Sequence, residues 1–391
     1  MLSPGVGATA QTGDEGLVDP PPLIISEFRL SGPGGDLDEF IEIYNNSNAA
    51  LTVNAPDGSS GFALVASDGL ARFLIPNGTV IPARGHFLGV NSVGYSLASY
   101  AAGNGATAAG DAAYTEDIPE NAGLALFATS DPANFDYGWR LDAAGSDEEA
   151  DPLYREGAGY PSLFFSRLES SFTRRLCSAP MTCTGFPRDT NDNAADFIFV
   201  DTMHHSAGAG ARLGAPGPEG LSSPIRRAGS GLSASLLDPL VDAHTSPNFF
   251  RDRAFTGDYN AAFGTVSFRR AFTNNTGASI TALRFRVADI TTAVQPYEIG
   301  DLRPRSSGAV TVTLSDGSTA NVQGTSREEP PAQDGRGGGF NTSLSVGTIN
   351  LASPLAPGES VNLQLVAGVE QTGDFRLCVT VETLPATGSE V

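Results

Sequence analysis

The chain has 391 residues and a net charge of −21 at pH 7, and its 23 basic residues are all arginine. Such a charge repels the phosphates of nucleic acids and of anionic membranes, so neither is an expected partner. The absence of lysine excludes Schiff-base chemistry, a P-loop lysine and lysine isopeptide crosslinks. The length favours two domain cores, and 46 glycines with 26 prolines disfavour long helices.

Alternation of apolar and polar residues recurs along the chain and predicts short β-strands. In the N-terminal half the predicted strands are 23–30, 39–45, 61–66, 79–81, 85–91, 124–129 and 196–200. In the C-terminal half they are 266–273, 280–287, 310–314, 344–349, 361–365 and 375–381. Turn-forming residues separate these strands, so the predicted fold class is all-β, with two antiparallel β-sandwiches.

The first two strands of the C-terminal half are joined by the turn sequence Asn274–Gly277. We therefore expect 266–273 and 280–287 to form a hairpin with one buried face. The apolar residues at 283, 285 and 287 would face the core, while Arg284 and Arg286 would point the other way.

A glycine- and proline-rich run, Leu213 to Pro224, interrupts the strand pattern and marks the end of the first domain. The predicted organisation is a leader at 1–21, a sandwich at 22–218, a linker at 219–232, a second sandwich at 233–385 and a tail at 386–391. The charge is uneven, with −18 on residues 1–220 and −3 on residues 221–391. The leader holds Ala8-Thr9-Ala10, which has the form of a signal-peptide cleavage site, although a disordered leader explains it equally well.

Two of the three cysteines, Cys177 and Cys183, lie close together around Pro180. Their spacing predicts a local disulfide and hence an oxidising compartment. A zinc site is the weaker interpretation, because it usually needs four ligands and the nearest histidine in sequence, His204, lies well downstream of this pair. The remaining Cys378 alternates with apolar residues and is predicted to be a half-exposed free thiol rather than an intermolecular crosslink.

A run of oxygen-bearing side chains resembles the first half of a calcium loop. The candidate ligands are Asp189, Asn191, Asn193 and Asp196. Ala194 stands where a calcium loop has glycine, and Val200 where it has glutamate. Asx-turn hydrogen bonds before a strand would explain the same residues without an ion, so calcium is the one possible cofactor and remains an alternative.

Catalytic motifs are not found in the sequence. The four histidines, His86, His204, His205 and His244, lack metal-ligand spacing and are predicted at loop or surface positions. No G-x-S-x-G elbow surrounds a serine, and Gly335–Gly339 reads as a loop rather than a phosphate cradle. Leu384–Gly388 has the form of a sortase signal, but only three residues follow it, so we interpret it as coincidence. We expect no enzymatic activity.

Two separated segments of residues 22–218 carry a family resemblance. Leu23–Phe28 with Glu39–Asn45 resembles the opening of a bacterial lamin-tail domain, and Arg188–Phe197 with Leu213–Gly217 is similar to its end. This resemblance implies an immunoglobulin-like sandwich in an exported protein. The C-terminal half is more loosely similar to immunoglobulin-like modules of surface proteins.

These observations predict a secreted or cell-surface structural protein. It could self-assemble into filaments or a matrix through exposed strands or the N-terminal segment. The alternative is an extracellular module that binds carbohydrate or another surface protein. Phe135, Tyr137 and Trp139 alternate as exposed aromatics would, although a core strand face explains them as well. An enzyme is the third possibility. The expected partner is a second copy of the chain, without membrane insertion.

Overall fold

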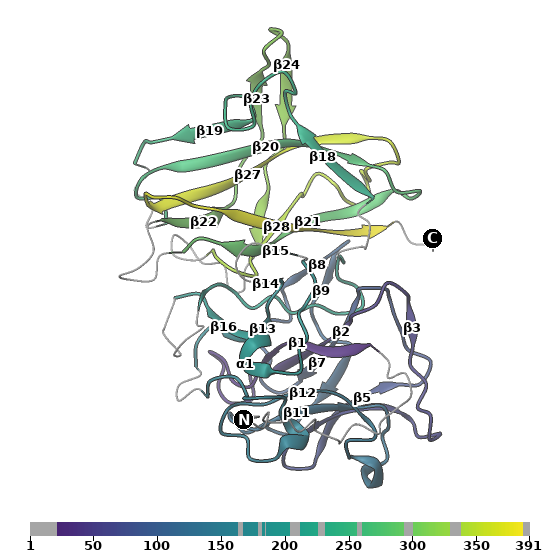
Figure 1. Ribbon diagram of the computed structural model, residues 1–391. Coiled ribbons are helices and arrows are strands. Elements are labelled where there is room, and N and C mark those ends of the chain that lie inside the picture. Colours follow the sequence, from purple (N-terminus) through teal and green to yellow (C-terminus); the bar gives the residue numbers. More distant parts are fainter. Residues whose placement is uncertain are drawn as a thin grey trace, which may run out of the picture.

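The computed structural model describes residues 22–162, 167–178, 182–183, 185–203, 212–225, 231–255, 260–292, 300–328 and 338–385. Strands make up 45% and helices 3% of it, which confirms the all-β prediction. The sheets form two groups stacked on each other, an N-terminal half before residue 214 and a C-terminal half after residue 231 (Figure 1). Within the described ranges, the isolated β-bridges Gly214↔Phe340 and Ile225↔Thr383 pair the segment between the halves with the C-terminal half.

The N-terminal half is built from two sheets that face each other. The larger sheet contains, in spatial order, β10 (Ala112–Tyr114), β7 (His86–Asn91), β2 (Phe40–Asn45), β1 (Leu23–Arg29), β13 (Ser170–Arg174), β16 (Phe197–Asp201) and β17 (Arg212–Leu213). The smaller sheet contains β12 (Arg140–Ala144), β11 (Leu124–Phe127), β4 (Gly61–Ala66) and β5 (Ala71–Pro76). Apolar side chains such as Ile25 and Phe62 fill the space between them. Because alternate residues of each strand point inward, one face of each sheet is buried in this core.

Short elements connect these sheets. The two-stranded ribbons pair β3 (Leu51–Thr52) with β6 (Val80–Ile81), β8 (Ala101–Gly103) with β9 (Ala106–Thr107), and β14 (Cys177–Ser178) with β15 (Thr182–Cys183). The helical turns are η1 (Pro132–Asn134), η2 (Pro152–Tyr154) and α1 (Asn193–Asp196). No helix within the described ranges is long and apolar enough to span a membrane.

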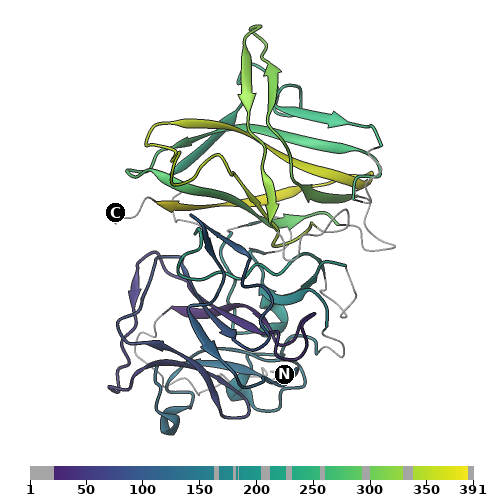
Figure 2. The same cartoon turned by 180° about the vertical axis from the view of Figure 1, so that it is seen from behind.

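The C-terminal half also has two facing sheets. One contains β18 (Leu232–Leu236), β20 (Thr265–Asn274), β27 (Ser360–Gln371) and β22 (Asp301–Arg305), and β19 (Phe249–Asp252) pairs with β20. The other contains β25 (Ser326–Glu328), β26 (Ser343–Ser345), β21 (Ile280–Ile290) and β28 (Leu377–Pro385). A ribbon of β23 (Val310–Thr313) and β24 (Thr319–Val322) projects away from the N-terminal half in both views (Figures 1 and 2).

The predicted hairpin of β20 and β21 is wrong. The two strands lie in different sheets, where β20 pairs with β27 and β21 pairs with β28. The rings of Phe272 and Phe285 instead meet across the core, with centroids 4.9 Å apart. The side chain of Asn274 donates to the carbonyls of Ala278 and Leu355, which fixes a connection that crosses between sheets. A hairpin and a sheet-to-sheet crossover both use Asn, Thr and Gly in the turn, so the turn sequence did not distinguish them.

The segment between the halves is buried. The predicted linker begins at residue 219, yet residues 213–220 all lie buried between the two groups of sheets. Residues 226–230 of the predicted linker lie outside the described ranges. The start of this segment is therefore part of the buried contact between the halves.

Candidate functional site

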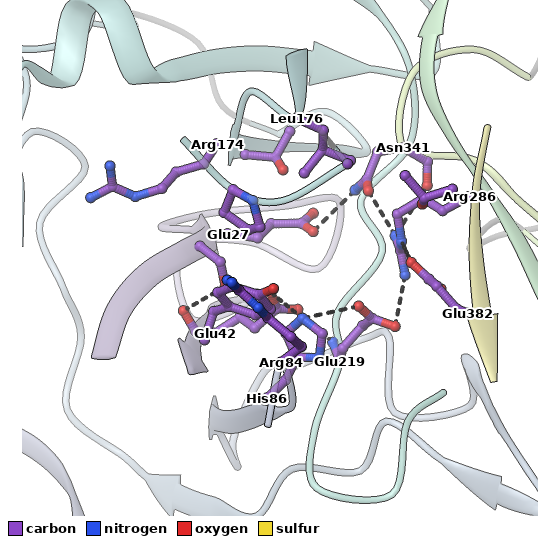
Figure 3. Close-up of a pocket in the computed structure, with 16 residues that line it drawn as sticks. Glu27, Glu42, Arg84, His86, Arg174, Leu176, Glu219, Arg286, Asn341 and Glu382 are labelled. Carbon is purple, nitrogen blue, oxygen red and sulfur yellow. Dashed lines mark hydrogen bonds and ion pairs between the residues drawn. The ribbon is translucent and has the colours of Figure 1, made fainter. Parts of the chain in front are cut away.

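Polar side chains fill the contact between the two halves (Figure 3). They come from β1, β2 and β7 of one half, from β21 and β28 of the other, and from the buried connection. We name as the interface cluster Glu27, Glu42, His86, Glu219, Arg284, Arg286 and Glu382. On each strand these residues alternate with core residues, so the polar outer faces of two sheets meet each other. With ordinary pKa values, six of the seven side chains would be charged at pH 7. Burying a charged group is unfavourable unless an opposite charge or hydrogen bonds compensate it.

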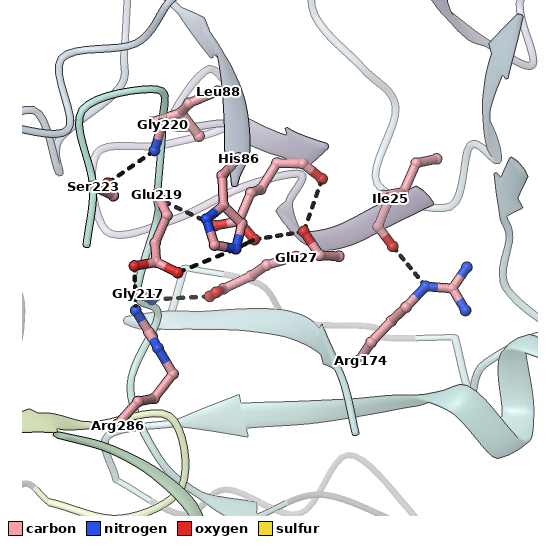
Figure 4. A network of polar contacts seen from close by, with 12 residues as sticks. Ile25, Glu27, His86, Leu88, Arg174, Gly217, Glu219, Gly220, Ser223 and Arg286 are labelled. Atoms are coloured by element: carbon pink, nitrogen blue, oxygen red, sulfur yellow. Dashed lines mark hydrogen bonds and ion pairs between the residues drawn. The ribbon is translucent and has the colours of Figure 1, made fainter. Parts of the chain in front are cut away.

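Arginines of the C-terminal half pair with glutamates from two parts of the chain. Glu219 of the connection forms an ion pair with Arg286 at 2.8 Å (Figure 4). Glu219 also forms an ion pair with Arg284. On the other side, Glu382 accepts from Arg284 Nε at 2.7 Å and from Arg286 Nε at 2.8 Å. The two guanidinium groups therefore lie between two carboxylates, which supplies the compensation that buried charges require.

A bridging amide extends the network into the N-terminal half. Asn341 Oδ1 accepts from Arg286 Nη1 at 2.7 Å, and Asn341 Nδ2 donates to Glu27 Oε2 at 3.0 Å. The other carboxylate oxygen of Glu27 accepts from Ser171 Oγ at 2.6 Å and from the Gly217 backbone N at 3.0 Å. Glu27 is thus held by both halves and by the connection.

Three side chains of the interface cluster converge beside a small cavity. His86 Nε2 lies 3.3 Å from Glu219 Oε2 and 3.8 Å from Glu42 Oε1. Glu42 also accepts from Ser26 Oγ and, at 2.8 Å, from the backbone N of Glu219. The cavity has a volume of about 40 Å³ and is lined by all three side chains (Figure 3). This volume suffices for a few water molecules or an ion but not for an organic substrate.

Burial dominates the protonation of the interface cluster. It raises the pKa of Glu27, and it raises the pKa of Glu42 well above the usual value, with the charge of Glu27 adding to that rise. Burial lowers the pKa of His86 to about 3, so the imidazole is neutral at pH 7. Burial alone would also raise the pKa of Glu382, but the charges of Arg284 and Arg286 hold that pKa below its usual value.

Comparisons with known proteins leave the chain without a family assignment. No family model, curated protein or solved structure matches it. The arrangement of its own side chains is therefore the basis for the functional argument.

A larger groove opens at another part of the contact between the halves. It has a volume of about 440 Å³ and lies between the β8–β9 ribbon and the segment 346–352. Polar groups of Asn104, Thr281 and Glu328 line it together with Leu351, which is 58% exposed. A groove of this size and composition can accommodate a small ligand.

The four predicted calcium ligands serve other contacts. Asp189 and Asp196 both face Arg174, at 3.3 Å from its Nη1, and Nη2 of the same guanidinium donates to both carboxylate oxygens of Asp142 at 2.8 Å. Asn193 is buried, where its amide bonds the backbone of residues 143, 145 and 156. Asn191 has a φ of 55° and forms the turn. These contacts account for the residues without an ion, and calcium binding stays a prediction.

The backbone pairs the two cysteines for which the sequence predicts a disulfide. The backbone register of β14 and β15 places Cys177 directly opposite Cys183. Opposite residues of antiparallel strands have Cα atoms about 4.5–5.5 Å apart, within the range of disulfides. Their side chains lie outside the described part, so the disulfide stays a prediction. Cys378 is a half-buried free cysteine in the chain, and burial raises its pKa.

The loop or surface prediction is wrong for His86, which is buried on β7. The alternation of Phe87 with His86 and Leu88 within a predicted strand was the available signal, but it does not reveal that the second face is also covered. His244 is exposed, while His204 and His205 lie outside the described residues.

The aromatic residues proposed as a binding face mostly pack inward. Phe135 stacks on Phe127 at 5.0 Å between ring centroids, and Trp139 packs against buried residues of the same sheet. Tyr137 is 40% exposed and lies under the guanidinium of Arg140. One exposed ring is a weak basis for stacking carbohydrate.

Proposed function

We propose that this chain is a secreted or cell-surface structural protein in which two immunoglobulin-like sandwiches form one rigid unit. The observation that carries the proposal is the interface cluster, because neither half satisfies its buried charges alone. Separating the halves would leave Arg286 without Glu219 and Glu27 without Asn341. Water would replace these contacts in the separated halves, whereas in the assembled chain a fully hydrogen-bonded polar network fits one relative arrangement of the halves.

The resemblance to lamin-tail domains is part of this proposal. The residues that carry it form β1 and β2 at the centre of the larger sheet, together with α1 and β16. These elements fit the opening and closing segments of a single sandwich. An exported location follows from the same resemblance and from the expected disulfide.

Self-assembly is the finer part of the proposal. β5 ends the smaller sheet of the N-terminal half, and its Leu74 is 37% exposed. An edge strand with an exposed apolar residue can accept a strand from a second copy. The charged residue of β5, Arg72, is buried in an ion pair with Asp68 and leaves Leu74 exposed. The leader at 1–21, which lies outside the described residues, is the predicted donor.

Light scattering and negative-stain microscopy of the full-length chain, with and without calcium, test self-assembly. We expect large regular oligomers or filaments, and we expect Leu74→Lys to reduce the particle mass because a lysine blocks the edge. The control is Leu351→Lys, which adds the same charge at an exposed position outside the sheet edges. A stable monomer of the unmodified chain in both conditions would contradict self-assembly.

The groove of about 440 Å³ supports a second candidate function, the binding of an extracellular ligand such as a glycan. Asn104 contributes to it from one half, and Ser345 and Asn350 contribute from the other. A glycan array probed with the full-length chain tests this function. Binding that is lost in Asn104→Ala would support it, and an array without any signal would exclude the glycans tested.

A further inference from the structure

We propose that Glu42, His86 and Glu219 form a binding site for a divalent transition-metal ion, with Zn²⁺ as the best fit. The ion would join β2 and β7 to the connection between the halves. This site does not depend on the structural role proposed above, because it rests on the local arrangement of donor atoms.

Geometry is the first argument for the site. The candidate ligand atoms of the three side chains all lie within 4.8 Å of one another. Zinc bonds of about 2.0–2.1 Å in a tetrahedral arrangement place neighbouring ligand atoms about 3.3 Å apart. His86 Nε2 and Glu219 Oε2 are 3.3 Å apart, and Glu42 Oε1, which lies 3.8 Å from His86 Nε2, would have to move closer to complete the set.

Charge is the second argument. The interface cluster contains four buried glutamates and two arginines, which leaves two more carboxylates than guanidinium groups. Arg84 also lines the cavity, but its guanidinium donates to Asn46 and Asn48. One divalent cation would balance the two excess carboxylates, and the alternative is a proton on each of two glutamates.

The contacts around the three side chains are the third argument. Glu219 Oε1 forms the ion pairs with the two arginines, and Glu219 Oε2 points toward His86. The arginines thus orient the carboxylate of Glu219 as groups around a metal site orient its ligands. The side chain of His86 is 91% buried, and its Nδ1 has no hydrogen-bond partner among the described residues. The adjoining cavity has room for a water molecule as a fourth ligand or as the partner of Nδ1.

The donor set selects the metal. One imidazole nitrogen with two carboxylate oxygens suits Zn²⁺, whereas Ca²⁺ prefers six to eight oxygen ligands. The proposed site therefore differs in position and in chemistry from the calcium site predicted at residues 189–196.

The proposal is tested by isothermal titration calorimetry of Zn²⁺ into the full-length chain after EDTA treatment. The visible absorption spectrum of the same chain loaded with Co²⁺ is the second measurement. We expect one ion per chain, a higher melting temperature with Zn²⁺ and the intense bands of tetrahedral Co²⁺. Glu42→Gln should weaken Zn²⁺ binding at least 10-fold. The metal-free variant should stay folded, because an amide of equal size removes part of the excess negative charge. The matched control His244→Gln, at an exposed histidine, should bind as the unmodified chain does.

His86→Gln provides the second variant and should also abolish the Co²⁺ bands, with circular dichroism confirming that it folds. The proposal would be overturned if the folded, unmodified chain bound neither ion, since protons would then balance the interface cluster. It would equally be overturned if Glu42→Gln and His86→Gln bound Zn²⁺ as tightly as the unmodified chain. The proposed self-assembly is tested by particle mass and not by metal binding. A failure of that proposal would therefore be distinguished from a failure of the zinc site.

Discussion

Buried carboxyl groups make single residues sensitive to pH near neutrality. Burial raises the pKa of Glu39 and of Glu169 to about 7, although Arg29 opposes the rise at Glu169. The pKa of Glu156 rises to about 9, again through burial first and then through the charge of Asp142. Each group binds a proton more tightly in the folded chain than in the unfolded chain, so each makes folding less favourable as the pH rises.

Glu156→Gln should reduce the loss of stability between about pH 5 and pH 9. The folded chain keeps the Glu156 proton up to about pH 9, whereas the unfolded chain releases it near 4.5. Raising the pH between these values therefore favours unfolding, by at most about 1.4 kcal/mol per pH unit for one group. Urea denaturation at several pH values measures the slope. Glu116→Gln at an exposed position is the control, and equal slopes for Glu156→Gln and the unmodified chain would refute the prediction.

Arg286→Met should lower the free energy of unfolding by about 3–5 kcal/mol, because it leaves the buried carboxylates of Glu219 and Glu382 short of a partner. Denaturation in urea measures this loss. The control Arg253→Met removes a charge at an exposed position and should change stability by less than about 0.5 kcal/mol. A loss as small as that of the control would show that the ion pairs contribute little.

At the scale of elements, strand existence was easier to predict than strand pairing. Every predicted strand overlaps one in the structure, because alternation of apolar and polar residues is a local property. Among the strands of five or more residues, β5, β12, β13, β18 and β22 were missed, and shorter strands such as β19 and β24 were missed as well. β13, with the sequence SSFTR, is central in its sheet but carries a single large apolar residue, so its pattern is too weak to recognise.

The β14–β15 ribbon leads to a prediction about thiols. If Cys177 and Cys183 form a disulfide, the unfolded, unreduced chain should show one reactive thiol, from Cys378, and the reduced chain should show all three. The small loop would contribute about 2 kcal/mol to stability. Thiol titration in denaturant with mass spectrometry of an unreduced digest makes the measurement. Three thiols before reduction of protein purified from an oxidising compartment would rule the disulfide out.

At the scale of the whole molecule, the fit between the two halves depends on the buried connection and on Asn341. Residues 213–220 are buried, and Gly217 and Glu219 contribute a backbone N–H and a carboxylate to the interface cluster. A run rich in glycine and proline is typical of an exposed linker, yet here its small residues allow the two sheets to approach closely. A Cβ at position 217 would lie 2.4 Å from Arg286 Nη1, so a larger residue there would displace the guanidinium from its place in the interface cluster.

Asn341→Ala should loosen the coupling of the two halves. It removes the hydrogen bonds to Arg286 and Glu27, and unsatisfied buried partners cost about 1–3 kcal/mol each. Scanning calorimetry of the unmodified chain should show one transition, and the variant should show a broader or divided one. Asn321→Ala, at an exposed position on the β23–β24 ribbon, is the control and should keep the single transition. Two separate transitions in the unmodified chain would contradict the coupling.

The sequence by itself determined the all-β class, most strand positions and the alternation that separates core residues from polar ones. Only the tertiary structure decided that β20 and β21 pair with other strands, and that residues 42, 86 and 219 meet beside one cavity. The physical reason is that alternation distinguishes the two faces of a strand but does not say what covers the second face. Here two polar faces cover each other, and charges that look solvent-exposed in the sequence form the centre of the molecule.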